Sequence, residues 1–338
     1  MQKEQLITAF IDLGKRLKNL KEDELQEWKR GAAINNKWFT ENNVLKAIEG
    51  ITFMLEKENL EKWINNYSIP AKNSKKIGVV MAGNIPMVGF HDLLCVLISG
   101  HILLAKLSSD DSFLMQKLIA LLCETEPSFQ AKIQLTERLN DADALIATGS
   151  DNTAKHFDYY FSKIPRIVRR NRVSVAILIG NETQEELTAL GGDIFQYFGL
   201  GCRNVSKLFI PKNMTLNHIY EALEPWKHVV DSVKYSNNYE YNRSIFLLKS
   251  VLHLDNGFLL AVETKELVSA IAVFYYEKYN SIDEVAEIIE NQKEKIQCIV
   301  AKDGVLENTV PFGSTQHPFP WNYADGVDTM SFLLNFQK

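Results

Sequence analysis

Short apolar runs that alternate with helix-like stretches constrain the fold of this chain more than any other feature. Four such runs lie at 77–82, 102–106, 144–147 and 173–178. Strands that are apolar almost throughout, and not only at alternate positions, are typical of a parallel sheet that helices cover on both faces. The pattern therefore predicts an α/β protein.

Length and patterning divide the chain into blocks. Since 338 residues exceed the usual size of a single core, we expect two domains. Residues 1–75 form a helical N-terminal segment, because apolar residues recur there at helical spacing. We expect this segment to pack on the main domain, with a separate partner-binding module as the alternative. A first α/β block at 76–180, a second block at 181–309 and a C-terminal segment at 310–338 complete the predicted division. The C-terminal segment is expected to return to the first block or to an interface.

Local signals predict elements within these blocks. Thr40 is a candidate N-cap in the helical segment. In the second block, Thr183 with Glu186 and Ser281 with Glu284 match the spacing of capping boxes, and each pair marks the start of a helix. Strands of the second block are predicted near 207–210, 243–249, 258–263, 270–276 and 296–301.

Composition and charge exclude several classes of function. The net charge of −5 argues against a general nucleic-acid binder. The polar N-terminus lacks the apolar core of a signal peptide, and no apolar run is long enough to span a bilayer. The cysteines show no CxxC pair, so we expect neither a metal site nor a disulfide framework. Free cysteines also suit a reducing compartment, so we expect a cytoplasmic location. They are Cys95, Cys123, Cys202 and Cys298.

Cys202 follows two glycines, Gly199 and Gly201, and precedes a strand-like run, so it is expected at an ordered helix-to-strand junction. Bare backbone amides near a thiol can lower its pKa and can hold a developing oxyanion. A nucleophilic role is one interpretation. The other is a small buried cysteine in a tight turn, which is what most such cysteines are.

Polar residues end two of the predicted strands of the first block. Asn84 follows the run at 77–82, and the carboxyl edge of an open α/β sheet is where ligands bind. Its amide can donate to an oxyanion, or it can serve as a turn residue before a helix that begins with proline. Lys106 ends the next strand, where it can hold a ribose hydroxyl or a phosphate, or can lie on the surface as a snorkelling lysine.

Thr148, Gly149 and Ser150 follow the third strand and open a predicted helix. Amides at a helix N-terminus, with hydroxyls beside them, suit a phosphate. An ordinary glycine turn with a serine cap uses the same residues, so both interpretations stay open.

Together these runs resemble the aldehyde dehydrogenase superfamily, and more closely the acyl-CoA reductases of the LuxC type. The resemblance covers roughly 76–338. It implies an aldehyde-dehydrogenase-like fold of two parallel-sheet α/β domains with a helical N-terminal lead-in. In that fold 76–180 binds a nicotinamide cofactor and 181–309 carries the nucleophilic cysteine. The matching runs are Ala82–Pro86, Ser99–Lys106, Ala147–Ala154, Gly199–Asn204 and Pro311–Asp328.

The resemblance also implies roles for individual residues. Cys202 matches the catalytic thiol, and Asn84 matches the side chain that forms the oxyanion hole with the cysteine's own amide. Lys106 matches the lysine on the adenosine ribose, and 148–150 matches the start of the cofactor-binding helix. Glu266 falls where the superfamily places a glutamate on the nicotinamide ribose, with an exposed glutamate at a helix end as the alternative.

Two departures from the superfamily pattern bear on the reaction. Oxidising members carry a glutamate base where this chain has 168–172, a stretch without a carboxylate. Because such a base activates water that hydrolyses an acyl-cysteine, its absence favours reduction. Ser109 stands where many NAD-using members have an acidic residue, which permits NADPH, while Asp110 and Asp111 next to it keep NADH as the alternative.

A cationic run lies in the same region and has two interpretations. It can contact the phosphates of coenzyme A, or it can form a solvated face. Its members are Arg166, Arg169, Arg170 and Arg172.

The resemblance therefore implies an acyl-CoA reductase that forms an acyl-cysteine and reduces it with NADPH to a fatty aldehyde. An acyl-phosphate reductase of the same superfamily is one alternative. A non-catalytic subunit of an acyl-activating complex, with the N-terminal helices as its docking surface, is another. The expected partners are the acyl-CoA substrate, further copies of the chain in a homo-oligomer and an acyl-activating enzyme.

Overall fold

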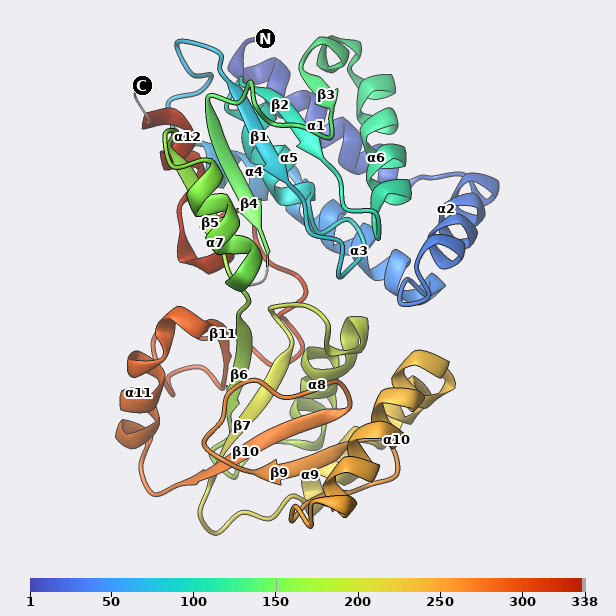
Figure 1. The fold of residues 1–338 in the computed structure, drawn as a ribbon, viewed down its shortest axis with the longest axis vertical. Helices are drawn as coiled ribbons and strands as arrows, with labels where there is room; N and C mark the ends of the chain where they lie inside the picture. The colour runs from blue at the N-terminus through green and yellow to red at the C-terminus, as the bar shows by residue number, and fades with distance from the viewer. Residues whose placement is uncertain (150, 336–338) are drawn as a thin grey trace. The chain divides into compact units, whose positions relative to one another are not determined.

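The computed structural model describes residues 1–149 and 151–335, and its contacts divide the chain into two compact units (Figure 1). Unit 1 comprises Met1–Asn171 together with the chain from His317 onward, and unit 2 comprises Arg172–Gln316. Each unit holds its own largely parallel sheet with helices packed on it, which confirms the predicted α/β class.

Sheet A of unit 1 is entirely parallel in its described strands, in the order β3-β2-β1-β4-β5. The chain runs outward from β1 to β3 and then returns to place β4 on the other side of β1. Ligands of open α/β sheets bind at the carboxyl ends of the strands beside such a reversal. The strands are β1 (Lys76–Val80), β2 (Ile102–Lys106), β3 (Ile133–Leu135), β4 (Ala144–Thr148) and β5 (Arg166–Arg169).

The helices of the N-terminal segment belong to unit 1, because α1 packs against α3, α5 and α6. Thr40 is the N-cap of α3, as predicted, and its Oγ1 accepts from the Asn43 N–H at 3.3 Å. The helices of unit 1 are α1 (Lys3–Lys18), α2 (Glu22–Asn35), α3 (Glu41–Met54), α4 (Lys57–Ile64), α5 (Phe90–Ile98), α6 (Ser112–Thr125), η1 (Pro127–Ala131), α7 (Asp151–Tyr160), η5 (Ala324–Gly326) and α12 (Thr329–Asn335).

The C-terminal part of the chain is fastened into unit 1 by buried polar contacts. Trp63 Nε1 donates to the Tyr323 hydroxyl at 2.7 Å. His101 accepts at Nδ1 from the Lys75 N–H and donates at Nε2 to the Leu333 carbonyl at 2.8 Å. Segments far apart in sequence thus complete one core.

Sheet B of unit 2 has the order β11-β6-β7-β10-β9-β8, and only the β8–β9 pair is antiparallel among its described strands. The helices packed on it include α8 on β7 and α11 on β10. The strands are β6 (Val173–Ile177), β7 (Val205–Pro211), β8 (Leu254–Asp255), β9 (Leu260–Glu263), β10 (Val273–Tyr279) and β11 (Ile296–Val300). The helices are α8 (Gln184–Phe195), η2 (Gln196–Gly199), α9 (Asn217–Leu223), η3 (Glu224–Asp231), α10 (Val233–Leu248), α11 (Ile282–Asn291) and η4 (Lys293–Lys295).

The helix starts predicted in the second block are confirmed. Thr183 Oγ1 accepts from the Glu186 N–H at 3.2 Å, and Glu186 Oε2 accepts from the Thr183 N–H at 2.7 Å, which is a complete capping box for α8. Ser281 caps α11 through the Glu284 N–H at 3.3 Å.

The sequence analysis grouped the apolar run at 173–178 with the first block, and this is wrong. Its strand β6 lies in sheet B between β11 and β7, and Val175 and Ile177 are buried in a cluster with residues of α11. A strand that is apolar on both faces suits the interior of either sheet, so its composition alone does not assign it.

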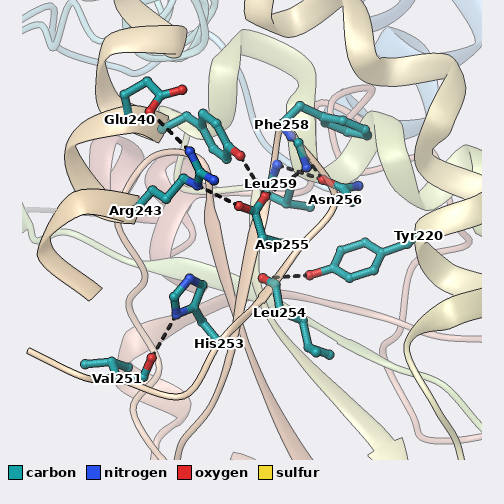
Figure 2. A network of polar contacts seen from close by, with 12 residues as sticks. Tyr220, Glu240, Arg243, Val251, His253, Leu254, Asp255, Asn256, Phe258 and Leu259 are labelled. Atoms are coloured by element: carbon teal, nitrogen blue, oxygen red, sulfur yellow. Dashed lines mark hydrogen bonds and ion pairs between the residues drawn. The ribbon is translucent and has the colours of Figure 1, made fainter. Parts of the chain in front are cut away.

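The strand predicted at 243–249 is wrong, because these residues form the end of α10. Tyr235, Tyr239 and Asn242 are buried at helical spacing, and this stripe outweighs the local run of apolar residues. Figure 2 shows Arg243 of α10 facing Asp255 of β8, with 3.0 Å between Nε and Oδ2. Tyr239 donates to the same carboxylate at 2.7 Å, so α10 is tied to the edge of sheet B.

Candidate functional site

Cys202 lies in a tight turn between η2 and β7, so the predicted helix-to-strand junction is confirmed. Its side chain is half-buried and forms no disulfide. Two hydrogen bonds close the turn around it. The Asn204 N–H donates to the Gly201 carbonyl at 3.0 Å, and the Gly201 N–H donates to Asn204 Oδ1 at 2.8 Å. The backbone on both sides of the thiol is therefore held in place.

Asn204 fastens this turn to the end of α8. Its side chain is 3% exposed, and Nδ2 donates to the carbonyls of Gln196 at 2.8 Å and Asp193 at 3.1 Å. The last carbonyls of a helix have no partner within the helix, so a buried amide that reaches them acts as a cap supplied from outside. The asparagine was visible in the sequence run around Cys202, but nothing in the sequence assigned it this role.

The segment before the turn has an unusual backbone. Tyr197, Phe198 and Gly199 have successive φ values of 54°, 57° and 78°, all in the left-handed region. For the two aromatic residues this conformation costs on the order of 1–3 kcal/mol each. Phe198 packs on Tyr235, with ring centroids 6.0 Å apart, and is 9% exposed. Packing of the rings thus stabilises a strained approach to Cys202.

Ser174 of β6 fixes the carbonyl side of Cys202. Its Oγ donates to the Cys202 carbonyl at 3.1 Å and accepts from the Cys298 N–H at 3.1 Å. The Arg203 guanidinium donates to Cys298 Sγ at 3.1 Å. Ser174 is fully buried and was not predicted, although a lone serine in the apolar run at 173–178 was a visible signal.

Glu266 lies in the segment that follows β9, not at the helix end that was the alternative, and its side chain is exposed. Ser206 Oγ donates to the Leu267 carbonyl at 2.8 Å, and Lys207 Nζ donates to the Thr264 carbonyl at 3.1 Å. Both donors are among the first residues of β7. The structure therefore brings the Glu266 segment beside the strand that directly follows the Cys202 turn.

Lys207 is itself fully buried and pairs with Glu277 of β10. Burial lowers the pKa of the Lys207 ammonium, while the hydrogen bond and charge of Glu277 act in the opposite direction. A buried ammonium with a carboxylate partner and a carbonyl acceptor is a rigid anchor for the 264–267 segment.

Four other predicted residues meet at one edge of sheet A. Asn84 follows the carboxyl end of β1, Lys106 ends β2, and Thr148 ends β4 and precedes Gly149. The three strands are neighbours, because Val80 pairs with both Lys106 and Ala147. Asn84 is exposed, whereas Lys106 and Thr148 are half-buried. Ser150, which was predicted with them, lies outside the described residues.

Two glycines allow close approaches at this edge. A Cβ on Gly83 would lie 2.4 Å from Ser108 Oγ, so the segment that carries Asn84 packs directly on the chain after β2. A Cβ on Gly149 would lie 3.0 Å from Thr153 Cβ, at the start of α7. An ammonium, a hydroxyl and a helix N-terminus with a cramped glycine turn form a donor set that fits a dinucleotide.

Both interpretations of the arginine run are wrong for Arg169. Its side chain is 5% exposed, and its Nη1 and Nη2 donate to Asp92 Oδ2 at 2.5 Å and to Thr329 Oγ1 at 3.0 Å. Arg166 contacts Asp158 at 3.0 Å, and Arg172 donates to backbone carbonyls of unit 2. Arg170 reaches the same Asp158 carboxylate as Arg166, at 4.0 Å. For Arg166 and Arg170 the two interpretations of the run stay predictions.

Across residues 1–149 and 151–335, no group of three or more His, Cys, Asp or Glu side chains is arranged to hold a metal ion. Within the same residues, no helix has the length and apolar character needed to cross a membrane.

Comparison with known proteins gives a family and a fold. The family described as acyl-CoA reductase (LuxC) matches residues 7–224, which include the Cys202 turn and the four residues at the edge of sheet A. No curated protein sequence matches the chain.

Solved aldehyde dehydrogenases are similar in structure at low sequence identity. The NAD⁺ complex of the Bacillus cereus enzyme has a TM-score of 0.62 and 13% identity, covering 89% of this chain and 72% of that one. KauB of Pseudomonas aeruginosa has a TM-score of 0.64 and 13% identity, with coverage of 89% and 72%. P. syringae AldA, an indole-3-acetaldehyde dehydrogenase in complex with NAD⁺ and IAA, has a TM-score of 0.66 and 11% identity, with coverage of 91% and 74%. These values establish an aldehyde-dehydrogenase-like fold.

Proposed function

The chain belongs to the acyl-CoA reductase (LuxC) family, and we propose on this basis that it reduces an acyl-CoA to an aldehyde through an acyl-cysteine at Cys202. The observation that carries the proposal is the Cys202 turn, which holds a half-buried thiol between the end of α8 and the start of β7. A fixed backbone beside a nucleophile keeps its amides pointed at the reacting carbonyl, which lowers the cost of reorganisation during the reaction.

In the first half of the reaction, the Cys202 thiolate attacks the thioester carbonyl and the coenzyme A thiol leaves. The Cys202 amide and the side-chain amide of Asn84 are proposed to donate to the oxyanion. Reduced nicotinamide, when bound, supplies a hydride to the carbonyl carbon of the new thioester. The thiohemiacetal that results on Cys202 loses its carbon–sulfur bond, so that the aldehyde leaves and the thiol is restored.

The cofactor is proposed to bind at the carboxyl edge of sheet A. Lys106 would hold the adenosine ribose, and Thr148, Gly149 and the start of α7 would hold phosphate oxygens. Glu266 would contact the nicotinamide ribose. The B. cereus and P. syringae enzymes, which share the fold, bind NAD⁺. For this chain we propose NADPH, with NADH as the alternative, because Ser109 leaves out a carboxylate that would repel a 2′-phosphate.

The proposal is tested by intact-protein mass spectrometry with acyl-CoAs of several chain lengths. The wild-type protein is expected to gain one acyl group and to lose it when NADPH is added. Cys202→Ala is expected to gain none, whereas Cys123→Ala, which changes a half-buried cysteine of α6, is expected to behave like the wild type. Acylation of Cys202→Ala would show that the nucleophile is misassigned.

The alternatives give different results in the same assay. An acyl-phosphate reductase would be acylated by acyl phosphate but not by acyl-CoA. A non-catalytic subunit would be acylated by neither and would co-purify with an acyl-activating enzyme. A cytoplasmic location and a homo-oligomeric state stay predictions.

A further inference from the structure

Asp193, near the end of α8, is a fully buried carboxylate that no part of the proposed reaction uses. It accepts three hydrogen bonds from one short segment of unit 2. The Gly313 N–H donates to Oδ2 at 2.6 Å, and the Thr315 N–H and Oγ1 donate to Oδ1 at 3.0 and 2.8 Å. A buried charge is tolerated only where donors of this kind replace water, so this contact is specific.

The segment that supplies these donors lies flush on α8. Gly313 has a φ of +77°, and a Cβ there would lie 3.1 Å from Ala189 Cβ, one helical turn before Asp193. Thr315 is 1% exposed. Both residues are thus held against one face of α8.

The same residue is connected to the nucleophile turn through its backbone. The Asp193 carbonyl accepts from Asn204 Nδ2 at 3.1 Å, and Asn204 Oδ1 accepts from the Gly201 N–H at 2.8 Å. A continuous series of buried hydrogen bonds therefore leads from Thr315 through Asp193 and Asn204 to the residue before Cys202. It lies wholly within unit 2.

We propose that Asp193 is a positioning residue, which holds the end of α8 through Thr315 and Gly313 and thereby sets the orientation of Asn204 and the Cys202 turn. The expected effect on acylation rests on the proposed function, because acylation of Cys202 is part of that proposal. Two acceptor oxygens are needed here, because an apolar side chain would leave the Gly313 and Thr315 N–H groups without the acceptor that each now has. Asparagine has only one acceptor oxygen, and its Nδ2 would face either the Gly313 N–H or the Thr315 N–H. It therefore cannot replace both oxygens of Asp193.

The test compares Thr315→Val, which removes only the hydroxyl donor, with Thr315→Ser, which keeps it. Two rates are measured at Cys202 by mass spectrometry: acylation by acyl-CoA and alkylation by iodoacetamide. We expect Thr315→Val to lower both rates by about tenfold or more, because small displacements of a reacting group cause losses of this size. Thr315→Ser is expected to stay close to the wild type, and alkylation of Cys123 is expected to be the same in all proteins.

Tyr279→Phe is the matched control for a purely structural effect. It removes a buried hydrogen bond of unit 2, from the Tyr279 hydroxyl to the Leu178 carbonyl at 2.7 Å. Tyr279 pairs with Pro211 at the far end of β7 from the Cys202 turn. This variant is expected to lower the unfolding midpoint but to leave both Cys202 rates unchanged. Equal changes in Tyr279→Phe and Thr315→Val would overturn the inference.

The inference and the proposed function fail in different ways. If the wild type is not acylated, the proposed function is wrong, while the alkylation rates still test the positioning of the thiol. If Thr315→Val is alkylated and acylated at the wild-type rates, the positioning role is wrong. Asp193→Asn, which keeps the side-chain volume, is expected to show the same loss and serves if Thr315→Val does not fold.

Discussion

Arg169 donates to Asp92 inside unit 1, with 2.5 Å between Nη1 and Oδ2, while its own carbonyl accepts from the Gly149 N–H at 3.2 Å. Both side chains are almost completely buried. The pair therefore connects α5, the end of β5 and the glycine turn that opens α7. Arg169, which the sequence analysis listed as a possible phosphate contact, therefore stabilises the edge of sheet A through buried contacts within unit 1.

Arg169→Met is expected to destabilise the protein by about 3–5 kcal/mol, because it leaves the Asp92 carboxylate buried without its cation. The double variant Arg169→Met with Asp92→Leu is expected to recover much of this loss, since no charge then stays buried. Urea unfolding of the two variants and the wild type measures the difference. A double variant less stable than Arg169→Met would contradict this explanation.

Asn84→Ala is expected to slow acylation of Cys202 by about 10²–10³-fold, the usual effect of losing one oxyanion donor. The unfolding midpoint is expected to change little, because the side chain is exposed. Asn66→Ala, an exposed asparagine of the same unit, serves as the control. If Asn84→Ala is acylated at the wild-type rate in single-turnover measurements, Asn84 does not donate to the oxyanion.

Glu266→Gln is expected to raise the KM for NADPH several-fold, with a smaller change in kcat, because the amide keeps an acceptor oxygen but loses the charge that strengthens its hydrogen bond to the ribose. Glu263→Gln changes a neighbouring exposed glutamate in β9 and is expected to leave both constants as they are. Steady-state kinetics at saturating acyl-CoA makes the comparison. Equal effects of the two variants would point to general electrostatics and not to a ribose contact.

Burial raises the pKa of the Asp193 carboxyl from 3.8 to about 6, although its three hydrogen bonds act in the opposite direction. Between pH 4 and 6 the folded protein therefore holds a proton that the unfolded chain has lost. Stability is expected to fall as the pH rises through this window, by up to about 3 kcal/mol. The unfolding free energy of Asp193→Asn, measured over the same range, is expected to lack this component. Identical pH profiles of the unfolding free energy for the wild type and Asp193→Asn would refute this role of the Asp193 carboxyl.

Several elements were predictable from the sequence because their signals are local. The strands β1, β2 and β4 follow from apolar runs, and the start of α8 follows from Thr183 and Glu186, which satisfy one another across a single turn. The glycines around Cys202 correctly indicated a turn between a helix and a strand.

The remaining features depend on partners distant in sequence. Arg169 is buried because Asp92 and Thr329 meet it from other elements, and nothing near it in the chain shows this. Similarly, the importance of Asn204 depends on carbonyls at the end of α8. The helical end of α10 was mistaken for a strand because its decisive contacts, from Tyr239 and Arg243, are made to Asp255 across a loop.

The hydrogen bond between Trp63 and Tyr323 spans 260 positions of the chain, and unit 2 lies within that interval. During synthesis the ribosome therefore has to produce all of unit 2 before unit 1 can acquire its last helix. Until then Trp63 and His101 lack their C-terminal partners. During synthesis, unit 2 can therefore complete its fold before unit 1 does, although most of unit 1 is made first.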